Sequence, residues 1–382
     1  MFQLNHVTLN GSSRPRLDDV TVTIPPGRTA IIGYSGAGKT SLLNVLAGFE
    51  RPDAGTVRGI VDERTAKEGH PAETAGLRAR LPLYWVPQNG GLWPHLTVDQ
   101  HLGCVWSAEL SDKLLRSLNL EHRRSALPGE LSLGERSRLA LARALATQAE
   151  VLLLDEPLSH VDPVRKSAYW NVLREMIEMV STVESVQESG TGEAMRTEDN
   201  PLIRPNGHLL PLEGGEGTSA KAVECTSRVS PRNGRMEHRG TSIVFTSHEP
   251  ETVLRHSETV ICLQAGRVVF QGTTTLLYDS PPSQEVGEFL GPLNWFDAEE
   301  ASFFLVDQYC SGGSSAIRPE RMILVTDADS LLELVAMPFR GGYAESVVRH
   351  SASGKTRTVL HQLTGDLPST GQRVRLHVGD AR

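Results

Sequence analysis

Apolar and polar residues alternate in two runs near the start of the chain, which is the period of β-strands. The apolar positions of these runs are Phe2, Leu4, Val7 and Leu9, and then Val20, Val22 and Ile24. Pro25-Pro26-Gly27 follows the second run and is typical of a turn. The short apolar run over 29–32 then predicts a buried strand.

A glycine-rich segment over 33–38 follows this strand, and 40–47 has the pattern of a helix that ends at Gly48. Helical patterns dominate 111–149, and bare apolar runs at 151–154 and 243–245 predict two more buried strands. Strands that alternate with helices imply an α/β domain around a largely parallel sheet.

The character of the chain changes between 180 and 240. This stretch is rich in Gly, Ser, Thr, Glu and Pro, and it has few aromatic residues and no sustained period. It predicts a disordered insertion, because such a composition buries too little apolar surface to order itself. Alternating segments return from about 292 and include 373–378, which predicts a small β-rich domain. We therefore expect a first domain over 1–179 and 241–290, the insertion over 180–240, and a second domain over 291–382.

Composition narrows the class of protein. A length of 382 residues suggests two domains, and the net charge of 38 − 46 = −8 gives no reason to expect a nucleic-acid partner. The scattered cysteines form no CxxC pair, which disfavours a zinc site or a disulfide framework and suits a reducing compartment. They are Cys104, Cys225, Cys262 and Cys310. We find no signal core and no apolar run near the roughly 20 residues that a bilayer demands, so the chain is not expected to cross a membrane by itself.

Residues 33–40 fit the pattern GxxxxGK[ST] without a mismatch. In such a loop the backbone N–H groups wrap phosphates, and the following helix points its positive dipole end at them. Lys39 is expected to meet the β- and γ-phosphates, and the Thr40 hydroxyl to bind Mg²⁺. The position between a strand and a helix disfavours a chance glycine-rich turn. The expected nucleotide-binding residues are Gly33, Tyr34, Ser35, Gly36, Ala37, Gly38, Lys39, Thr40 and Ser41.

Two carboxylates follow the predicted strand over 151–154. Open α/β sheets place their sites at the carboxyl ends of strands. We expect Asp155 to hold Mg²⁺ through its waters and Glu156 to polarise the attacking water as a general base. Alone, this pair would equally suit a solvated strand end; the glycine-rich loop favours the catalytic interpretation.

At this point the motifs resemble those of the ABC ATPases, the ATP-hydrolysing subunits of ATP-binding-cassette transporters. Residues 131–136, Leu-Ser-Leu-Gly-Glu-Arg, are similar to the family signature, and 139–145 to the segment that follows it. In that family the signature serine and glycine contact the γ-phosphate of the ATP held by the other subunit. The resemblance assigns these roles to Ser132 and Gly134, and a hydroxyl and an N–H at a helix N-terminus suit them.

Three more residues match the family in the expected order. Gln88 resembles the glutamine that touches Mg²⁺ and water and senses the membrane partner, and His248 resembles the switch histidine that contacts the γ-phosphate. Asp162 sits where the family has the aspartate that links the two active sites. Each of them alone is more typical of a surface, capping or structural residue. The ordered set makes an accidental resemblance negligible.

Three departures from the family pattern stand out. Leu133 replaces the first signature glycine, and Glu135 stands where glutamine is common. No aromatic residue lies near Gly11, where the family carries one that stacks on adenine. The candidates to replace it are Leu9, Arg14 and Arg16. The insertion over 180–240 lengthens a connection that is short in the family, and we expect it to loop out on the surface and to leave the sheet order intact.

Residues 91–98, 288–295 and 316–320 resemble segments of bacterial importer ATPases. The resemblance implies a P-loop NTPase cassette with an antiparallel β subdomain and a helical subdomain, followed by a small transport-associated OB-like (TOBE) β-barrel. It implies an ATPase that uses ATP and Mg²⁺, works as a homodimer, and couples hydrolysis to solute uptake. Its partners would be an integral-membrane permease, contacted around 88–106, and indirectly an extracytoplasmic solute-binding protein. The location would be the cytoplasmic face of the inner membrane, as a peripheral protein.

Alternatives from other classes stay open. One is an ABC ATPase that acts on nucleic acid, although such relatives usually carry coiled-coil or zinc insertions or two cassettes. Another is a regulatory ATPase without transport, against which Lys39, Asp155, Glu156 and His248 argue. The β-rich domain could sense a small regulator, brace the dimer, or do both. The solute remains open among sugars, polyamines, ferric iron, sulfate and molybdate, which importers of this subgroup take up.

Overall fold

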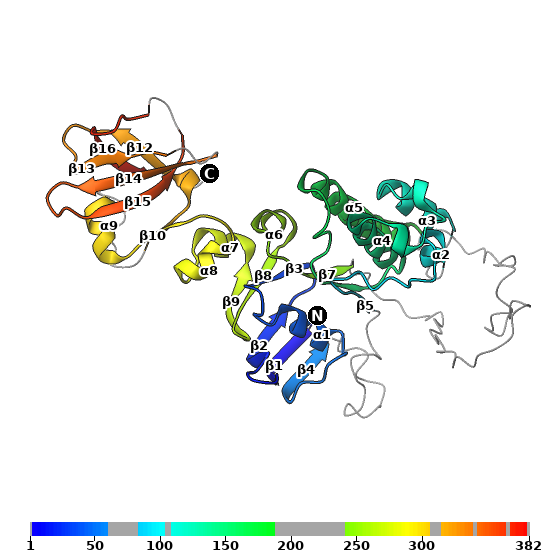
Figure 1. Cartoon of the computed structure of the whole chain (residues 1–382). Coiled ribbons are helices and arrows are strands. Elements are labelled where there is room, and N and C mark those ends of the chain that lie inside the picture. Colours follow the sequence, from blue (N-terminus) through cyan, green and yellow to red (C-terminus); the bar gives the residue numbers. More distant parts are fainter. Residues whose placement is uncertain are drawn as a thin grey trace, which may run out of the picture.

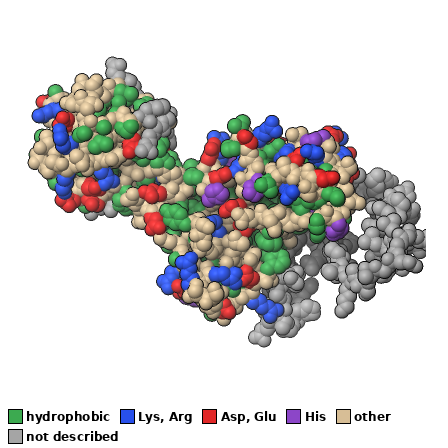
Figure 2. Space-filling model, viewed as in Figure 1, with side chains coloured by type: hydrophobic (Ala, Val, Ile, Leu, Met, Phe, Trp, Pro, Cys, Tyr) green, Lys and Arg blue, Asp and Glu red, His purple; other side chains and the backbone are tan. Residues whose placement is uncertain are grey.

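The computed structural model describes residues 2–59, 83–103, 108–187, 241–305, 315–338, 342–363 and 367–379. These residues form two lobes joined by a narrow neck (Figures 1 and 2). Figure 2 shows charges of both signs interspersed over this face of both lobes. Within the described residues, no helix is long and apolar enough to span a membrane.

The centre of the larger lobe is a six-stranded sheet in the order β5-β6-β7-β3-β8-β9. The first five strands are parallel, and β9 pairs with β8 in antiparallel fashion. Strands β6 and β7 are buried along their whole length, as strands covered on both faces are. The strands are β3 (Arg28–Ile32), β5 (Leu83–Val86), β6 (Val151–Leu154), β7 (Ser242–Thr246), β8 (Thr259–Gln264) and β9 (Arg267–Thr273).

A three-stranded antiparallel sheet covers one face of the central sheet. Its strands lie in the order β2-β1-β4 and are β1 (Phe2–Leu9), β2 (Leu17–Ile24) and β4 (Ala54–Gly59). Helix α1 (Lys39–Leu46) contributes to the apolar core that the two sheets share, for example through Leu42 beside Leu4 and Val244. This core fixes the start of α1 at the carboxyl ends of the central strands.

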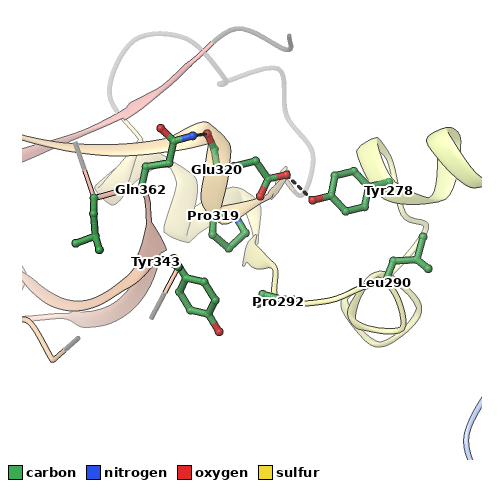
Figure 3. A pocket seen from close by; sticks show the side chains of 9 residues that line it. Tyr278, Leu290, Pro292, Pro319, Glu320, Tyr343 and Gln362 are labelled. Atoms are coloured by element: carbon green, nitrogen blue, oxygen red, sulfur yellow. Dashed lines mark hydrogen bonds between the residues drawn. The ribbon is translucent and has the colours of Figure 1, made fainter. Parts of the chain in front are cut away.

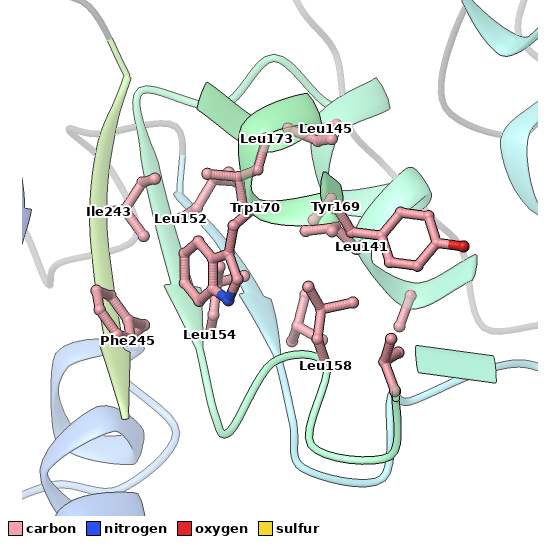
Figure 4. Packing of buried hydrophobic residues seen from close by; sticks show 14 of the residues in the cluster. Leu141, Leu145, Leu152, Leu154, Leu158, Tyr169, Trp170, Leu173, Ile243 and Phe245 are labelled. Atoms are coloured by element: carbon pink, nitrogen blue, oxygen red, sulfur yellow. The ribbon is translucent and has the colours of Figure 1, made fainter. Parts of the chain in front are cut away.

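Helices cover the other face of the central sheet around Trp170 (Figure 4). The Trp170 ring lies 4.9 Å from the ring of Phe245 on β7 and stacks on His256 at 4.7 Å. The helices of this part are α2 (Val98–Gly103), α3 (Ala108–Ser117), α4 (Leu133–Ala146), α5 (Pro163–Gln187) and α6 (Pro250–His256), with 3₁₀ turns η3 (Glu121–Arg123) and η4 (Pro128–Glu130).

Helices α7 (Thr274–Asp279) and α8 (Gln284–Glu288) lead to the smaller lobe. There, strand order β12-β16-β13-β14-β15 makes an antiparallel sheet with a core of its own. The sheet curls so that its edges meet, since the backbone N–H of Gln362 after β15 donates to Met322 O on β12 at 2.9 Å. The elements are β10 (Asn294–Phe296), α9 (Ala298–Phe304), β11 (Ser315–Ile317), η5 (Pro319–Arg321), β12 (Met322–Thr326), β13 (Leu332–Ala336), β14 (Ala344–His350), β15 (Thr356–His361) and β16 (Arg373–Val378).

Arg318 joins the two lobes. Its side chain is buried, and its guanidinium lies 4.2 Å from the ring centre of Tyr278. It donates to the carbonyls of Tyr278, Gly287, Gly291 and Pro292. Burial lowers the pKa of Arg318, and the Tyr278 hydroxyl donates to Glu320 beside it. Burial, followed by this bond, raises the pKa of Tyr278 to about 12. The arginine and its carbonyl partners therefore anchor the smaller lobe to the end of the cassette.

The expected fold class is confirmed. The predicted strands over 29–32, 151–154 and 243–245 are β3, β6 and β7, and the predicted helix over 40–47 is α1. The expected antiparallel β part, helical part and C-terminal β lobe are all present. The boundary at 180 falls inside α5, which continues to Gln187, and the rest of the predicted insertion, 188–240, lies outside the described residues.

Candidate active site

The glycine-rich loop runs from the end of β3 to the start of α1. Gly33 and Gly38 have positive φ values of 151° and 105°. A Cβ on Gly33 would lie 2.2 Å from Leu263 O, and one on Gly38 would lie 2.5 Å from Arg16 O. Side chains are therefore excluded at both positions. Gly38 caps α1 without any side-chain acceptor, so the first N–H groups of the helix are free to face an anion.

Lys39 lies folded back across this loop. Its Nζ donates to Gly33 O at 2.8 Å and to Tyr34 O at 3.1 Å. Burial lowers the pKa of Lys39, and the nearby carboxylates of Glu156 and Asp155 oppose that effect. The ammonium group is thus held at the mouth of the loop by two carbonyls that a phosphate can displace.

Asp155 is held between two threonines at the carboxyl end of β6. Thr40 Oγ1 donates to its Oδ2 at 2.9 Å, and Thr246 Oγ1 donates to its Oδ1 at 2.6 Å. Asp155 is only 3% exposed. Carboxylate and hydroxyl oxygens are ligands that Mg²⁺ prefers, and here they lie side by side below the phosphate loop, so the residues fit that ion.

Glu156 faces two side chains from the loops that follow β5 and β7. Gln88 Nε2 donates to its Oε2 at 3.1 Å, and His248 Nδ1 lies 3.4 Å from its Oε1. Its backbone N–H donates to Thr246 Oγ1 at 2.8 Å. Glu156 has a φ of 48°, a left-handed conformation that non-glycine residues rarely adopt. This strained backbone conformation places the Glu156 carboxylate between Gln88 and His248.

Lys39, Thr40 and Glu156 line one cleft of about 550 Å³, and Asp155 is hydrogen-bonded to it through Thr40. The structure brings the phosphate loop together with Gln88, Glu156 and His248. The lining residues are Arg14, Pro15, Arg16, Ser35, Gly36, Gly38, Lys39, Thr40, Ser41, Gln88, Glu156 and His248. Two loop residues point elsewhere: Ala37 is buried, and the Tyr34 ring packs edge-on against Phe289 at 4.8 Å.

Ser132, Gly134 and Asp162 do not line this cleft. Ser132 is the N-cap of α4, where its hydroxyl accepts from the N–H of Glu135. Asp162 directly precedes α5, and its Oδ1 accepts from Val164 N at 2.9 Å. A Cβ on Gly134 would lie 3.1 Å from His160 O, so the start of α4 packs closely on the loop before α5. Within one chain these three residues lie outside the cleft that the phosphate loop lines.

The signature departures have local explanations. Leu133 is the first residue of α4, and its side chain is 57% exposed, so it needs no internal packing partner. Glu135 completes a capping box: its Oε2 accepts from Ser132 N at 2.8 Å, and its Oε1 accepts from Arg123 Nε at 3.0 Å. Burial would raise the pKa of Glu135, but these hydrogen bonds outweigh it and bring the pKa to about 2.

Of the three candidates for the missing adenine contact, Leu9 is wrong because it is buried, and Arg16 is already paired with another side chain. Leu9 is only 4% exposed because its side chain belongs to the core between the sheets. Arg16 is paired with Glu50, and its Nε donates to Asn10 O at 3.3 Å. Arg14 is exposed at the rim of the cleft, and its Nη2 lies 3.7 Å from where a Gly36 Cβ would be. Arg14 therefore remains as the candidate.

Thr246 is a site residue that the sequence analysis missed. It holds Asp155 with its hydroxyl hydrogen and Glu156 with its hydroxyl oxygen. Its position at the end of a bare apolar strand, just before His248, was the available signal.

The chain is similar to known ATP-binding proteins of ABC transporters. The family model described as ABC transporter matches residues 17–159. The Fe(3+) ions import ATP-binding protein FbpC of Yersinia pestis is 35% identical over 216 residues, which cover 54% of this chain and 60% of that protein. The probable sulfate/thiosulfate import ATP-binding protein CysA of Chlorella vulgaris is 32% identical over 226 residues, which cover 56% of this chain and 92% of that protein.

The match spans only 60% of the length of the Yersinia relative. A solved structure described as the ATP binding subunit of an ABC transporter superposes with a TM-score of 0.49 at 18% identity, covering 72% of this chain and 91% of that one. The shared cassette accounts for nearly the whole of the Chlorella protein. On that similarity, the chain belongs to the family of ABC transporter ATP-binding proteins.

Proposed function

We propose that this protein hydrolyses ATP as the ATP-binding subunit of an ABC importer, and that it couples hydrolysis at a dimer interface to solute uptake through a separate permease. The observation that carries the proposal is the placement of Gln88 and His248 on the two oxygens of Glu156, in the same cleft as Lys39. The import ATP-binding proteins among its relatives support the importer class.

In the proposed reaction a water oxygen attacks the γ-phosphorus, the bond from that phosphorus to the β–γ bridging oxygen breaks, and ADP and phosphate form. Glu156 accepts the proton of the attacking water. Lys39 leaves its two carbonyl partners to contact the β- and γ-phosphates, and His248 donates to the γ-phosphate. Thr40, Asp155 and Gln88 would hold Mg²⁺, which supplies charge neutralisation at the phosphates when it is bound.

We also propose that a second copy of the chain completes the site. Ser132, Gly134 and Asp162 lie outside the cleft of their own subunit, and they would reach the nucleotide of the partner in a two-fold dimer. The N-terminus of α4 offers a hydroxyl and N–H groups for a γ-phosphate.

On the nucleotide-base side, we propose Arg14 as the contact that replaces an aromatic residue. Its guanidinium has no hydrogen-bond or ion-pair partner among the described residues, and it lies at the rim of the cleft. A planar guanidinium stacks on aromatic faces.

The permease would dock near the end of β5, where the residue Trp85 precedes Gln88 by three positions. The Phe49 side chain is 57% exposed and lies 4.9 Å from the Trp85 ring, which offers an apolar contact beside the site. An importer subunit of this kind sits at the cytoplasmic face of the cell membrane and meets the extracytoplasmic solute-binding protein only through the permease. The solute stays open among the classes named above.

The smaller lobe is proposed to be a TOBE-like regulatory domain. A cleft of about 350 Å³ lies where it meets the cassette and is lined by Tyr278, Glu320 and Tyr343 among others (Figure 3). Ligand screening of the full chain by thermal shift, with molybdate, sulfate and nucleotides, tests this role. Stabilisation by one of these ligands that Tyr343→Ala removes supports regulation. Stabilisation by nucleotides alone that Tyr343→Ala leaves unchanged supports a dimer brace.

The replacement Glu156→Gln tests the proposed function. It removes the base but keeps both hydrogen-bonding partners in place, so ATP should accumulate and hold the dimer closed. Size-exclusion chromatography with ATP should show a dimer for this variant and a monomer with ADP, together with loss of phosphate release. A variant that keeps its turnover, or that stays monomeric with ATP, would refute the composite-site mechanism.

A further inference from the structure

A partly buried ion pair lies next to the switch histidine. Lys166 projects from α5 with a side chain that is only 8% exposed, and its ammonium pairs with the carboxylate of Glu249. Glu249 follows His248 in sequence and is the N-cap residue of α6. The pair therefore connects the start of α5 with the loop that carries the histidine.

Glu249 is fixed by more than this pair. Its Oε2 accepts from Thr252 Oγ1 at 2.8 Å, and its backbone N–H donates to Ser247 Oγ at 3.0 Å. Burial alone would raise the pKa of Glu249, but the hydrogen bonds from Lys166 and Thr252 outweigh it, so the pKa lies below its usual value. The carboxylate thus stays charged and keeps both of its oxygens engaged.

Lys166 is equally fixed at its other end. Its backbone N–H donates to Asp162 O at 2.9 Å, one helical turn back along α5. Asp162 is the residue proposed to face the partner subunit. The ion pair therefore lies on a continuous path of contacts from the partner-facing loop to the histidine.

Few contacts hold the His248 side chain in place. Its side chain is 59% exposed, and among the described residues its ring has one polar contact, to Glu156 at 3.4 Å. A cavity of about 300 Å³ opens on its other side and is lined by Lys166, Trp170, Glu249 and His256 among others. Without the ion pair, this cavity gives the loop room to move away from Glu156.

We propose that Lys166 and Glu249 are positioning residues that hold His248 against Glu156 and so set the contact of His248 with the γ-phosphate. This inference rests on the proposed function, because it requires His248 to contact that phosphate. Lys166 touches no reacting atom and acts through the loop alone. The effect is expected in turnover and in the discrimination between ATP and ADP, which differ by the γ-phosphate.

The test uses the full chain with Lys166→Met and Lys166→Arg. Lys166→Met should lower kcat by roughly tenfold or more, because small displacements of positioned groups cost rates of that order. Its affinity for ADP should stay within about twofold, whereas its affinity for ATP should fall further, so that its preference for ATP over ADP is reduced. Lys166→Arg retains a cation that can reach Glu249 and should restore most of the turnover.

A double-mutant cycle separates positioning from general stability. In a His248→Ala background, Lys166→Met should produce no further loss of kcat, because the two changes remove the same contact. The matched control is Arg349→Met, which breaks the Arg349–Glu333 ion pair on the smaller lobe and should leave turnover unchanged. If Lys166→Met destabilises the fold, Lys166→Met combined with Glu249→Leu removes both charges together and carries the same expectations.

Three outcomes overturn the inference: full activity of Lys166→Met, equal loss of ATP and ADP affinity with a lower Tm, or additive effects of Lys166→Met and His248→Ala. Failure of the proposed function is seen separately, as an unmodified chain that does not hydrolyse ATP. In that case the ATP-to-ADP affinity ratio of Lys166→Met still decides the inference, because binding needs no turnover. An unchanged ratio would then refute it.

Discussion

The two halves of the proposed ATP site differ in how complete they are within one chain. The phosphate-loop half is assembled: Lys39 and Glu156 line one cleft, and Asp155 accepts a hydrogen bond from Thr40, which lines it too. The signature half is preformed but directed elsewhere, since Ser132 and Gly134 begin a capped helix that does not reach that cleft. One half is assembled within one chain, while the other, in the proposed dimer, would act on the nucleotide of the second subunit.

The two halves are also stabilised by different means. In the phosphate-loop half, side chains from separate strands hold one another, as Thr246 holds both Asp155 and Glu156. In the signature half, the support is local, through the capping box of Ser132 and Glu135 and the bond from Arg123. Substitutions should therefore damage nucleotide binding in the first half and dimer closure in the second.

The largest effect is expected from Lys39→Met, which breaks the assembled half. Loss of the cation at the β- and γ-phosphates should lower turnover by about 10²- to 10³-fold and weaken ATP binding. Steady-state ATPase assays and nucleotide titration measure it. Unchanged ATP binding with loss of dimerisation alone would contradict the assignment of Lys39 to the nucleotide-binding half.

Next in size is Ser132→Ala, which breaks the other half. ATP-dependent dimerisation and turnover should fall by at least about tenfold, whereas ADP affinity of the monomer stays unchanged. Loss of the helix cap should also cost about 1 kcal/mol of stability. Analytical ultracentrifugation with ATP and ADP, together with thermal unfolding, separates the two effects. A weakened ADP affinity would contradict the division between the halves.

The variant Glu135→Gln tests how the Glu135 carboxylate stabilises the signature half at different pH values. The pKa of Glu135 in the fold is about 2, below its ordinary value of 4.5, so its stabilising contribution is present above pH 4.5. It is lost as the pH falls from 4.5 towards 2, because the unfolded chain then binds a proton that the fold excludes. Glu135→Gln should lower the free energy of unfolding at neutral pH by about 2 kcal/mol and flatten this acid dependence. Denaturant unfolding at several pH values measures both, and an unchanged acid slope would contradict the assignment.

The smallest effect is expected from Arg14→Ala, at the rim of the assembled half. It should raise the Kd for ATP by a few fold, as loss of one exposed cation–π contact of about 0.5–1 kcal/mol implies. The matched control is Arg28→Ala, whose guanidinium pairs with Glu258 away from the cleft. If the Arg14→Ala and Arg28→Ala variants bind ATP with equal affinity, Arg14 does not contact the nucleotide.

The sequence by itself determined the contiguous parts of this protein. The loop over 33–40 and the carboxylates after β6 could be predicted because backbone geometry fixes what each short segment can do: glycine where no Cβ fits, a helix start after the lysine, a strand end that carries Asp155. The α/β class followed for the same reason, since periodicity is local.

Only the tertiary structure decided which distant side chains meet. Strands β5, β6 and β7 are neighbours in the sheet although long stretches of sequence separate them, and this order brings Gln88, Glu156 and His248 together. The same holds for the burial of Leu9, which removed it from the nucleotide site, and for the Lys166–Glu249 pair. Burial and side-chain partners of this kind arise when separate elements pack together. The spacing of residues along the chain therefore does not reveal them.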